Sequence, residues 1–233
     1  MHTLSDVELR RFLAIAKDDP FYLMYYVDFF TGLRESELIG LPWDCIDFAK
    51  GTIRVYRQFV RIASGPDKGK MMFTSLKNHK ERTIHPAPSV MEALRQAKEK
   101  QNRQRLVAGS SWDNVYDMVF TRDNGMFIRF KTLYVHFKAL VGKLNRPEVR
   151  FHDIRHTYAT LAIQSEIDFK TLSLSLGQRL WVRCGYTAAQ KKPKPLHLQG
   201  FRLVEHSGFE PLTPTLPVLC ATSCANAPQH KIV

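Results

Sequence analysis

Long hydrophobic runs are missing from this 233-residue sequence. No stretch approaches the roughly 20 consecutive apolar residues that a bilayer-spanning helix needs. The first ten residues, MHTLSDVELR, lack the hydrophobic region of a signal peptide. We therefore expect a cytoplasmic protein without a membrane partner.

Cysteine is also scarce, and its spacing excludes the common cysteine-based sites. Cys45, Cys184, Cys220 and Cys224 form no CxxC pair, and no histidine cluster completes a zinc pattern. We expect reduced thiols and neither a structural metal nor a cofactor.

Acidic residues are few relative to basic ones, with 22 Asp and Glu against 34 Lys and Arg, a net charge of +12. The imbalance is concentrated in residues 54–105, where 13 basic residues face four acidic ones. A local excess of nine positive charges indicates a polyanionic partner such as nucleic acid, and a solvated basic surface is the alternative.

Hydrophobic periodicity predicts a mainly α-helical, α+β fold with one small antiparallel sheet. The expected helices cover residues 5–17, 20–30, 34–41, 88–106, 129–144, 151–165 and 168–176. The expected strands, 52–60, 70–76 and 82–86, form a meander with a basic hairpin tip, and 117–121 is a further short extended piece.

Composition changes abruptly after residue 178. Residues 179–233 hold six of the chain's twelve prolines and three of its four cysteines, without a sustained helical or strand pattern. We expect a folded domain over residues 1–178 and a mostly irregular tail over 179–233.

The segment FHDIRHTYAT (151–160) carries the densest titratable chemistry of the chain. At about 100° per residue, His152, Arg155 and His156 share one helix face, opposite the apolar face of Phe151 and Ile154. A guanidinium group beside imidazoles suits a phosphodiester, because arginine binds its oxygens bidentately and histidine can move a proton. Two alternatives are a charged helix rim and a metal site at the i, i+4 histidine pair.

Two further segments belong with this one. TGLRESELIGL (31–41) places Arg34 at a helix start with Glu37 one turn away to orient it. SLKNHKERTI (75–84) places Lys77 at a hairpin that could reach into a groove. A plain surface ion pair and a solvated lysine are the alternatives.

These three motifs, in this order and spacing, resemble those of the tyrosine recombinase, or phage integrase, family. TGLRESEL is similar to the first-arginine motif of the family, LKNHKERTI to its β-hairpin lysine motif and HDIRHTYAT to its H-x-x-R motif. The resemblance covers about residues 3–178. It implies the family's catalytic domain without the helical core-binding domain that normally precedes it, so the chain looks N-terminally truncated.

The resemblance implies that a tyrosine attacks a DNA phosphate and forms a 3′-phosphotyrosyl link. Arg34 and Arg155, with Glu37 supporting Arg34, would stabilise charge on the phosphate. Lys77 would protonate the leaving 5′-oxygen, and His152 would assist proton transfer or hold the phosphate. Because the covalent link conserves the phosphodiester bond, neither ATP nor a metal is needed. The implied partners are double-stranded DNA and a recombinase multimer assembled on it, in the integration or excision of a mobile element.

The sequence departs from the family pattern after this motif. Leu176-Gly177-Gln178 stands where the family has a Leu-Gly-His turn, and glutamine can donate a hydrogen bond but cannot shuttle a proton. Tyr186 is the sole tyrosine after Tyr158 and therefore the candidate nucleophile. A catalytically dead DNA-binding remnant is the second reading, and a metal-dependent phosphohydrolase is the third.

Overall fold

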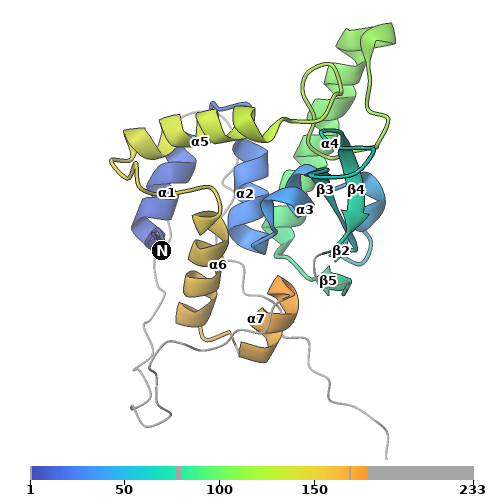
Figure 1. Ribbon diagram of the computed structural model, residues 1–233. Coiled ribbons are helices and arrows are strands. Elements are labelled where there is room, and N and C mark those ends of the chain that lie inside the picture. The colour runs from blue at the N-terminus through green and yellow to red at the C-terminus, as the bar shows by residue number, and fades with distance from the viewer. Residues whose placement is uncertain (1, 77–79, 168, 178–233) are drawn as a thin grey trace, which may run out of the picture.

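The computed structural model describes residues 2–76, 80–167 and 169–177, and the gaps include Lys77 and everything from Gln178 onward. This part contains seven α-helices and two small sheets, and the sheets lie at one side of the molecule, next to α3 and α4 (Figure 1). The α-helices are α1 (Asp6–Ile15), α2 (Tyr22–Thr31), α3 (Glu35–Ile39), α4 (Pro88–Ala108), α5 (Phe130–Lys143), α6 (Asp153–Gln164) and α7 (Phe169–Leu176). Two 3₁₀ turns, η1 (Trp43–Cys45) and η2 (Gly109–Ser111), complete the helical elements of the described residues. The predicted mainly α, α+β class is confirmed.

The predicted helices all form, with small differences at their ends. The capping box expected at the first helix is present, since the Ser5 hydroxyl accepts from the backbone N–H of Glu8 and the Glu8 carboxylate accepts from the backbone N–H of Ser5. The second helix begins at Tyr22 rather than at Pro20, because the preceding residues form a turn closed by Tyr22 N–H and the Asp19 carbonyl.

The predicted strand pairing is wrong in two respects. The strands are β1 (Ile46–Asp47), β2 (Thr52–Val55), β3 (Arg57–Arg61), β4 (Met71–Ser75) and β5 (Arg82–Ile84). The run 52–60 divides between two sheets, ordered β1-β2-β5 and β3-β4, and the last strand pairs with β2 instead of β4. The buried residues Ile53, Val55 and Phe59 keep the same two-residue phase on both sides of the division, so the pattern holds no signal of the break or of the pairing partner. Residues 117–121 contribute two isolated bridges rather than a strand.

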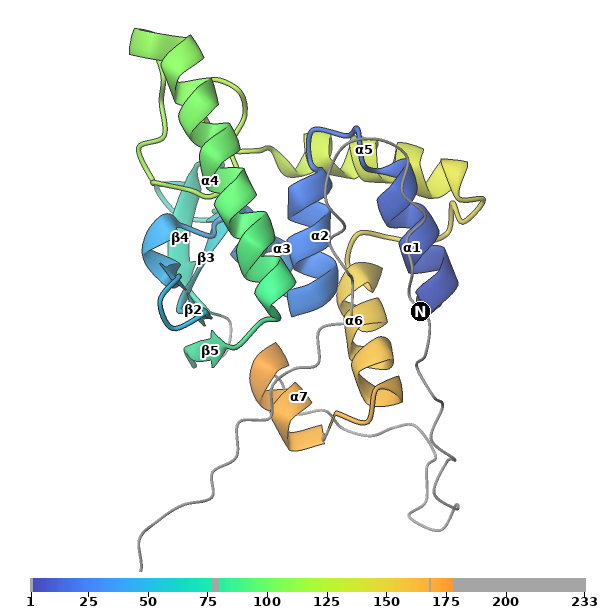
Figure 2. The same cartoon turned by 180° about the vertical axis from the view of Figure 1, so that it is seen from behind.

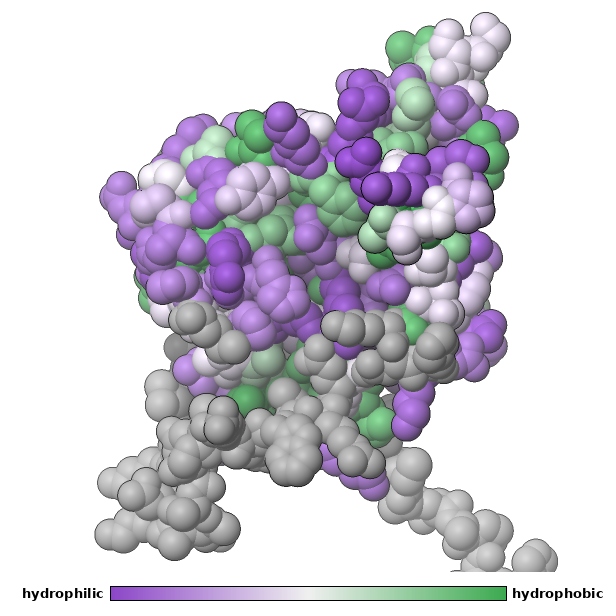
Figure 3. Space-filling model, in the orientation of Figure 1, coloured by the Kyte–Doolittle hydropathy of each residue, from purple (hydrophilic) through white to green (hydrophobic). Residues whose placement is uncertain are grey.

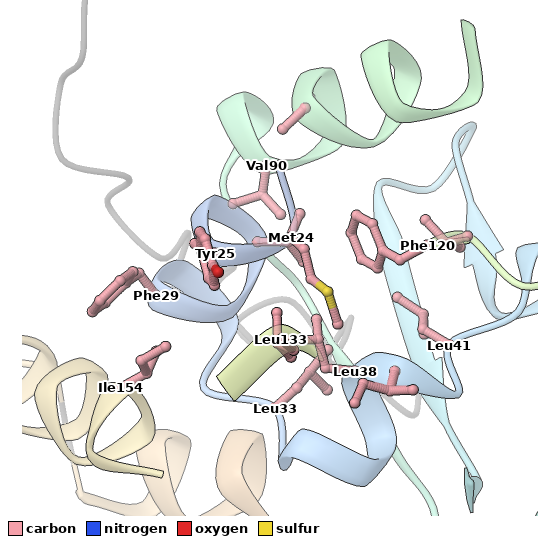
Figure 4. Close-up of a cluster of buried hydrophobic side chains, with 14 of the residues drawn as sticks. Met24, Tyr25, Phe29, Leu33, Leu38, Leu41, Val90, Phe120, Leu133 and Ile154 are labelled. Atoms are coloured by element: carbon pink, nitrogen blue, oxygen red, sulfur yellow. The ribbon is translucent and has the colours of Figure 1, made fainter. Parts of the chain in front are cut away.

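Helix α2 lies at the centre of the described structure. It packs against α1, α4 and α6, and in the view from the opposite side α4 runs beside it, nearer the viewer (Figure 2). Its Met24, Tyr25 and Phe29 side chains are almost fully buried, and Figure 4 shows them between Val90 of α4 and Ile154 of α6. The protein covers most of this apolar helix, and only the face of Tyr22, Tyr26 and Phe30 is partly exposed.

The molecular surface is mostly hydrophilic on the face shown in Figure 3. Hydrophobic side chains also lie at the far end of α4, which projects from the body, and there Leu106 and Val107 are 82% and 90% exposed. None of the helices among the described residues is both long and apolar enough to cross a membrane.

Gly32 ends α2 at the point where three helices approach one another. Its φ of +60° is in the left-handed region, and its N–H closes the helix on the Asp28 carbonyl. A Cβ atom at this position would lie 2.4 Å from Cδ1 of Tyr158 in α6 and 3.0 Å from Cδ2 of Leu176 in α7. Glycine therefore allows both the turn and the close packing that places Arg34 next to α6 and α7.

We expect Gly32→Ala to destabilise the protein strongly. Left-handed backbone costs an alanine about 1–2 kcal/mol, and the clash with Tyr158 adds about 1–3 kcal/mol of overpacking. Chemical denaturation measures the loss in the free energy of unfolding. Gly51→Ala is the matched control, because Gly51 has a φ of +64° but nothing within 4 Å of its Cβ position. Equal losses in the two variants would contradict the packing role.

Candidate phosphate-binding site

Arg34 occupies the start of α3 and is fixed there by Glu37. Its backbone N–H donates to Oε2 of Glu37 at 2.9 Å, and its guanidinium NH1 donates to Oε1 at 2.8 Å. The Glu37 side chain is 1% exposed and that of Arg34 is 17% exposed. The carboxylate is therefore an internal support, whereas the guanidinium group stays open to a ligand. The two side chains that the spacing predicts to pair are thus hydrogen-bonded to each other.

Arg82 of β5 is a third member of this cluster. Its NH1 and NH2 groups donate to the two carboxylate oxygens of Glu37 at 3.0 and 2.6 Å, and its Nε donates to the Ser175 carbonyl of α7 at 2.8 Å. Sequence reasoning missed this residue, because Arg82 is one of 13 basic residues in its region and the strand pairing that points it inward was not predicted.

Arg155 is buried, with 4% exposure, between α2, α6 and α7. Its NH1 group donates to the Gly32 carbonyl and its NH2 group to the Leu176 carbonyl, each at 2.5 Å. This placement contradicts the alternative of a solvated helix rim. A buried guanidinium group needs partners for its remaining N–H donors and for its charge.

Arg34, Arg82 and Arg155 affect one another electrostatically, although they come from distant parts of the chain. Burial together with the positive charges of Arg34 and Arg82 lowers the pKa of Arg155 to about 10, while Glu37 and Asp28 oppose this shift. Arg155 therefore remains a cation at neutral pH. The two arginines predicted to converge lie in the same electrostatic environment.

The carboxylates near these arginines do not balance their charge. Burial raises the pKa of Glu37, but the hydrogen bonds and charge of Arg82 and the bonds from Arg34 outweigh it and keep this pKa below its ordinary value. Asp28 lies in α2 with 1% exposure, and its Oδ1 atom has no hydrogen-bond partner among the described residues. Burial raises the pKa of Asp28 well above its usual range, which favours the uncharged form. Glu35 is a further carboxyl group near Asp28, and burial raises its pKa as well. Three cations around the bound carboxylate of Glu37 form a site suited to an anion.

His152 occupies the N-cap position of α6, where its side chain makes no capping hydrogen bond, and it lies near the arginines. Burial and the charge of Arg155 lower the pKa of His152 from 6.5, Asp153 opposes them, and Arg150 and Arg34 add to the lowering. The His152 and His156 rings meet edge to face with centroids 5.0 Å apart. Burial and His152 likewise lower the pKa of His156. Both imidazoles are therefore mainly neutral at pH 7, and a neutral imidazole can accept a proton.

Among the residues that the structure describes, the geometry around the histidine pair gives a metal no further ligand. The Asp153 carboxylate, between them in sequence, is fully buried and accepts from the backbone N–H and Nε of Arg150 at 3.1 and 3.3 Å. Within residues 2–76, 80–167 and 169–177, no three His, Cys, Asp or Glu side chains group as metal ligands.

Three of the predicted site residues lie outside the described residues, namely Lys77, Gln178 and Tyr186. The structure brings together Arg34, Glu37, His152 and Arg155, and adds Arg82. The roles of all these residues in catalysis stay predictions.

Comparison with known proteins identifies the family. The sequence matches the phage integrase family over residues 3–179. The chain belongs to this family, which confirms the resemblance inferred from the three motifs. The XerC-like tyrosine recombinase of Caldanaerobacter subterraneus subsp. tengcongensis is 30% identical over 184 residues, which is 76% of this chain and 47% of that protein. The chain thus spans about half the length of this relative.

Solved structures agree on the fold. The Tn1549 transposon integrase, in complex with transposon right end DNA, superposes with a TM-score of 0.65 at 22% identity, over 76% of this chain and 58% of its own. The XerA recombinase superposes with a TM-score of 0.58 at 23% identity, over 76% and 56% of the two chains. The mainly α architecture with a small antiparallel sheet is the fold that these proteins share with the described residues.

We expect the His152 ring to titrate below pH 6.5 and Arg34→Gln to raise its midpoint, because one nearby positive charge is removed. NMR of the imidazole ring protons measures both values. Since the folded state disfavours the protonated ring, this group lowers stability as pH falls below 6.5 toward its folded pKa, and the loss becomes smaller in Arg34→Gln.

Arg54→Gln is the control, because Arg54 is 60% exposed and pairs with Glu81 at 2.7 Å on the β2–β5 sheet. An unchanged His152 midpoint in Arg34→Gln, or equal shifts in both variants, would show that Arg34 and His152 do not share a site.

Proposed function

We propose that the chain is the catalytic domain of a site-specific DNA recombinase of the integrase type. It cuts one DNA strand through a 3′-phosphotyrosyl intermediate and rejoins it to another strand. The observation that carries the proposal is that the buried Arg155 donates to the Gly32 carbonyl, two residues before Arg34, whose guanidinium group Glu37 holds in place. Family membership supports the same reaction.

The two arginines stabilise the phosphate during attack. Charge grows on its non-bridging oxygens as the fifth phosphorus–oxygen bond forms, and preorganised guanidinium donors bind that charge most strongly in the transition state. Arg155 is held by two backbone carbonyls, and Arg34 is held by Glu37. Neither has to reorganise when the DNA phosphate arrives.

Two proton transfers accompany the cut. The hydroxyl oxygen of Tyr186 bonds to phosphorus and its proton passes to His152, which the lowered pKa keeps neutral at pH 7. The bond from phosphorus to the 5′-oxygen breaks, and Lys77 protonates that oxygen as it leaves. Gln178 donates a hydrogen bond to the phosphate. The reverse sequence with a new 5′-hydroxyl rejoins the strands.

Double-stranded DNA is the proposed substrate, and the catalytic domain is proposed to cover residues 1–178. The nine excess positive charges of residues 54–105 favour a polyanion. Exchange of strands needs more than one active site, so we infer that copies of the protein assemble on the DNA. The integration or excision of a mobile element is the corresponding biological role.

A library of nicked duplexes with random sequence tests the reaction without knowledge of the target. A nick beside the cleavage site lets the short 5′-hydroxyl fragment diffuse away, so the covalent adduct accumulates and is recovered on a denaturing gel. We expect an adduct with the intact chain and none with Tyr186→Phe. Arg34→Gln should slow adduct formation by about a hundredfold or more, the usual cost of losing one such donor.

Arg54→Gln again serves as the control and should keep the rate. Salt-sensitive binding of DNA with no adduct for any variant would contradict the enzymatic proposal and indicate a DNA-binding remnant. An adduct that persists in Tyr186→Phe would assign the nucleophile to another residue.

A further inference from the structure

Arg82 joins three elements of the candidate site. From β5 it binds both oxygens of Glu37 in α3 through NH1 and NH2, and through Nε it binds the Ser175 carbonyl at the end of α7. Its side chain is 7% exposed. All three types of guanidinium nitrogen are therefore engaged inside the protein, and Arg82 supports other groups instead of facing a ligand.

The carboxylate of Glu37 links Arg82 to Arg34, which is part of the phosphate site. Glu37 accepts from both arginines, so its carboxylate has a fixed position between them. A carboxylate that accepts a bidentate pair on one side has little freedom to rotate. The orientation of the Arg34 guanidinium group therefore depends on Arg82, although the two arginines share no bond.

Arg82 is also linked to the site through α7, by its hydrogen bond to the Ser175 carbonyl. The neighbouring carbonyl, that of Leu176, accepts from Arg155, so two arginines together hold the last turn of α7. The next residue, Gly177, has a φ of +59°, and a Cβ there would lie 3.0 Å from Cδ of Arg82. The chain thus turns against Arg82 immediately before Gln178.

We propose that Arg82 is a positioning residue that sets the phosphate-binding arginines and the end of α7 relative to each other. This inference rests on the proposed function and deepens it. Arg82 acts through these groups and not on the phosphate itself. It aligns Arg34 through Glu37 and the last turn of α7 through Ser175, so that the phosphate-binding arginines keep one arrangement.

A role limited to neutralising Glu37 makes a different prediction for Arg82→Lys. Lysine keeps the positive charge and can bind the carboxylate, but its single ammonium group cannot reproduce a bidentate pair together with a separate bond to Ser175. Charge neutralisation alone is preserved in this variant, whereas the alignment is lost.

Two measurements on the full chain separate these roles. The first is the affinity for inorganic phosphate, followed by the NMR shifts of the His152 ring. The second is the rate of covalent adduct formation on a nicked duplex at saturating DNA. In Arg82→Lys we expect phosphate to bind about tenfold more weakly, the loss of about one charge-assisted hydrogen bond. The adduct should form about a hundredfold more slowly, as for a misplacement of about 1 Å.

Arg54→Lys is the matched control, because Arg54 lies on the paired strand β2 and binds the exposed carboxylate of Glu81. It should leave both measurements unchanged. Gly177→Ala is a second test of the alignment. Its added Cβ would crowd the Arg82 side chain without removing any charge, so it should also slow adduct formation. If Arg82→Lys binds the nicked duplex as tightly as the wild-type chain does, its slower adduct formation reflects the chemical step and not DNA binding.

Wild-type phosphate affinity in a folded Arg82→Lys variant would overturn the inference, and so would a loss equal to that of Arg54→Lys. If the unaltered chain binds phosphate but forms no adduct, the proposed recombinase activity fails. The positioning role is then decided by phosphate affinity alone. If the unaltered chain binds no phosphate, both proposals are overturned.

Discussion

The carboxylate of Glu37 is the group on which the candidate site depends. It is nearly inaccessible to solvent, and it stays ionised because two guanidinium groups bind it from different elements. Removing either partner would leave this buried carboxylate with one guanidinium group instead of two, which is destabilising. The ion pairs therefore fix α3, β5 and, through Arg82, the end of α7 in one arrangement.

In the same arrangement, the described hydrogen-bond partners of Arg155 do not neutralise its positive charge. Arg155 donates to two neutral carbonyls, and burial favours the uncharged form of Asp28, the carboxyl beside it. The consequence is a buried cation next to the more open Arg34. Such a site is stabilised by an anion that enters from outside, and a DNA phosphate has the charge and the oxygen geometry that two arginines recognise.

Sequence reasoning located most of the fold and of this site, and its failures have physical causes. Helices and the pairing of Arg34 with Glu37 follow from local spacing, which a single sequence contains. The division of strand 52–60 and the pairing of β5 with β2 depend on contacts far apart in the chain. Arg82 was missed for that reason, since its role exists only when those strands pair. Lys77, Gln178 and Tyr186 lie outside the described residues and stay predictions.

The most direct test of the account is a crystal structure of the protein with tungstate, a heavy tetrahedral anion that scatters anomalously. The account predicts an anomalous peak with anion oxygens about 3 Å from the guanidinium groups of both Arg34 and Arg155. A bound anion that contacts neither arginine, or that contacts one while the other points into a separate region, would contradict the convergence on a single phosphate.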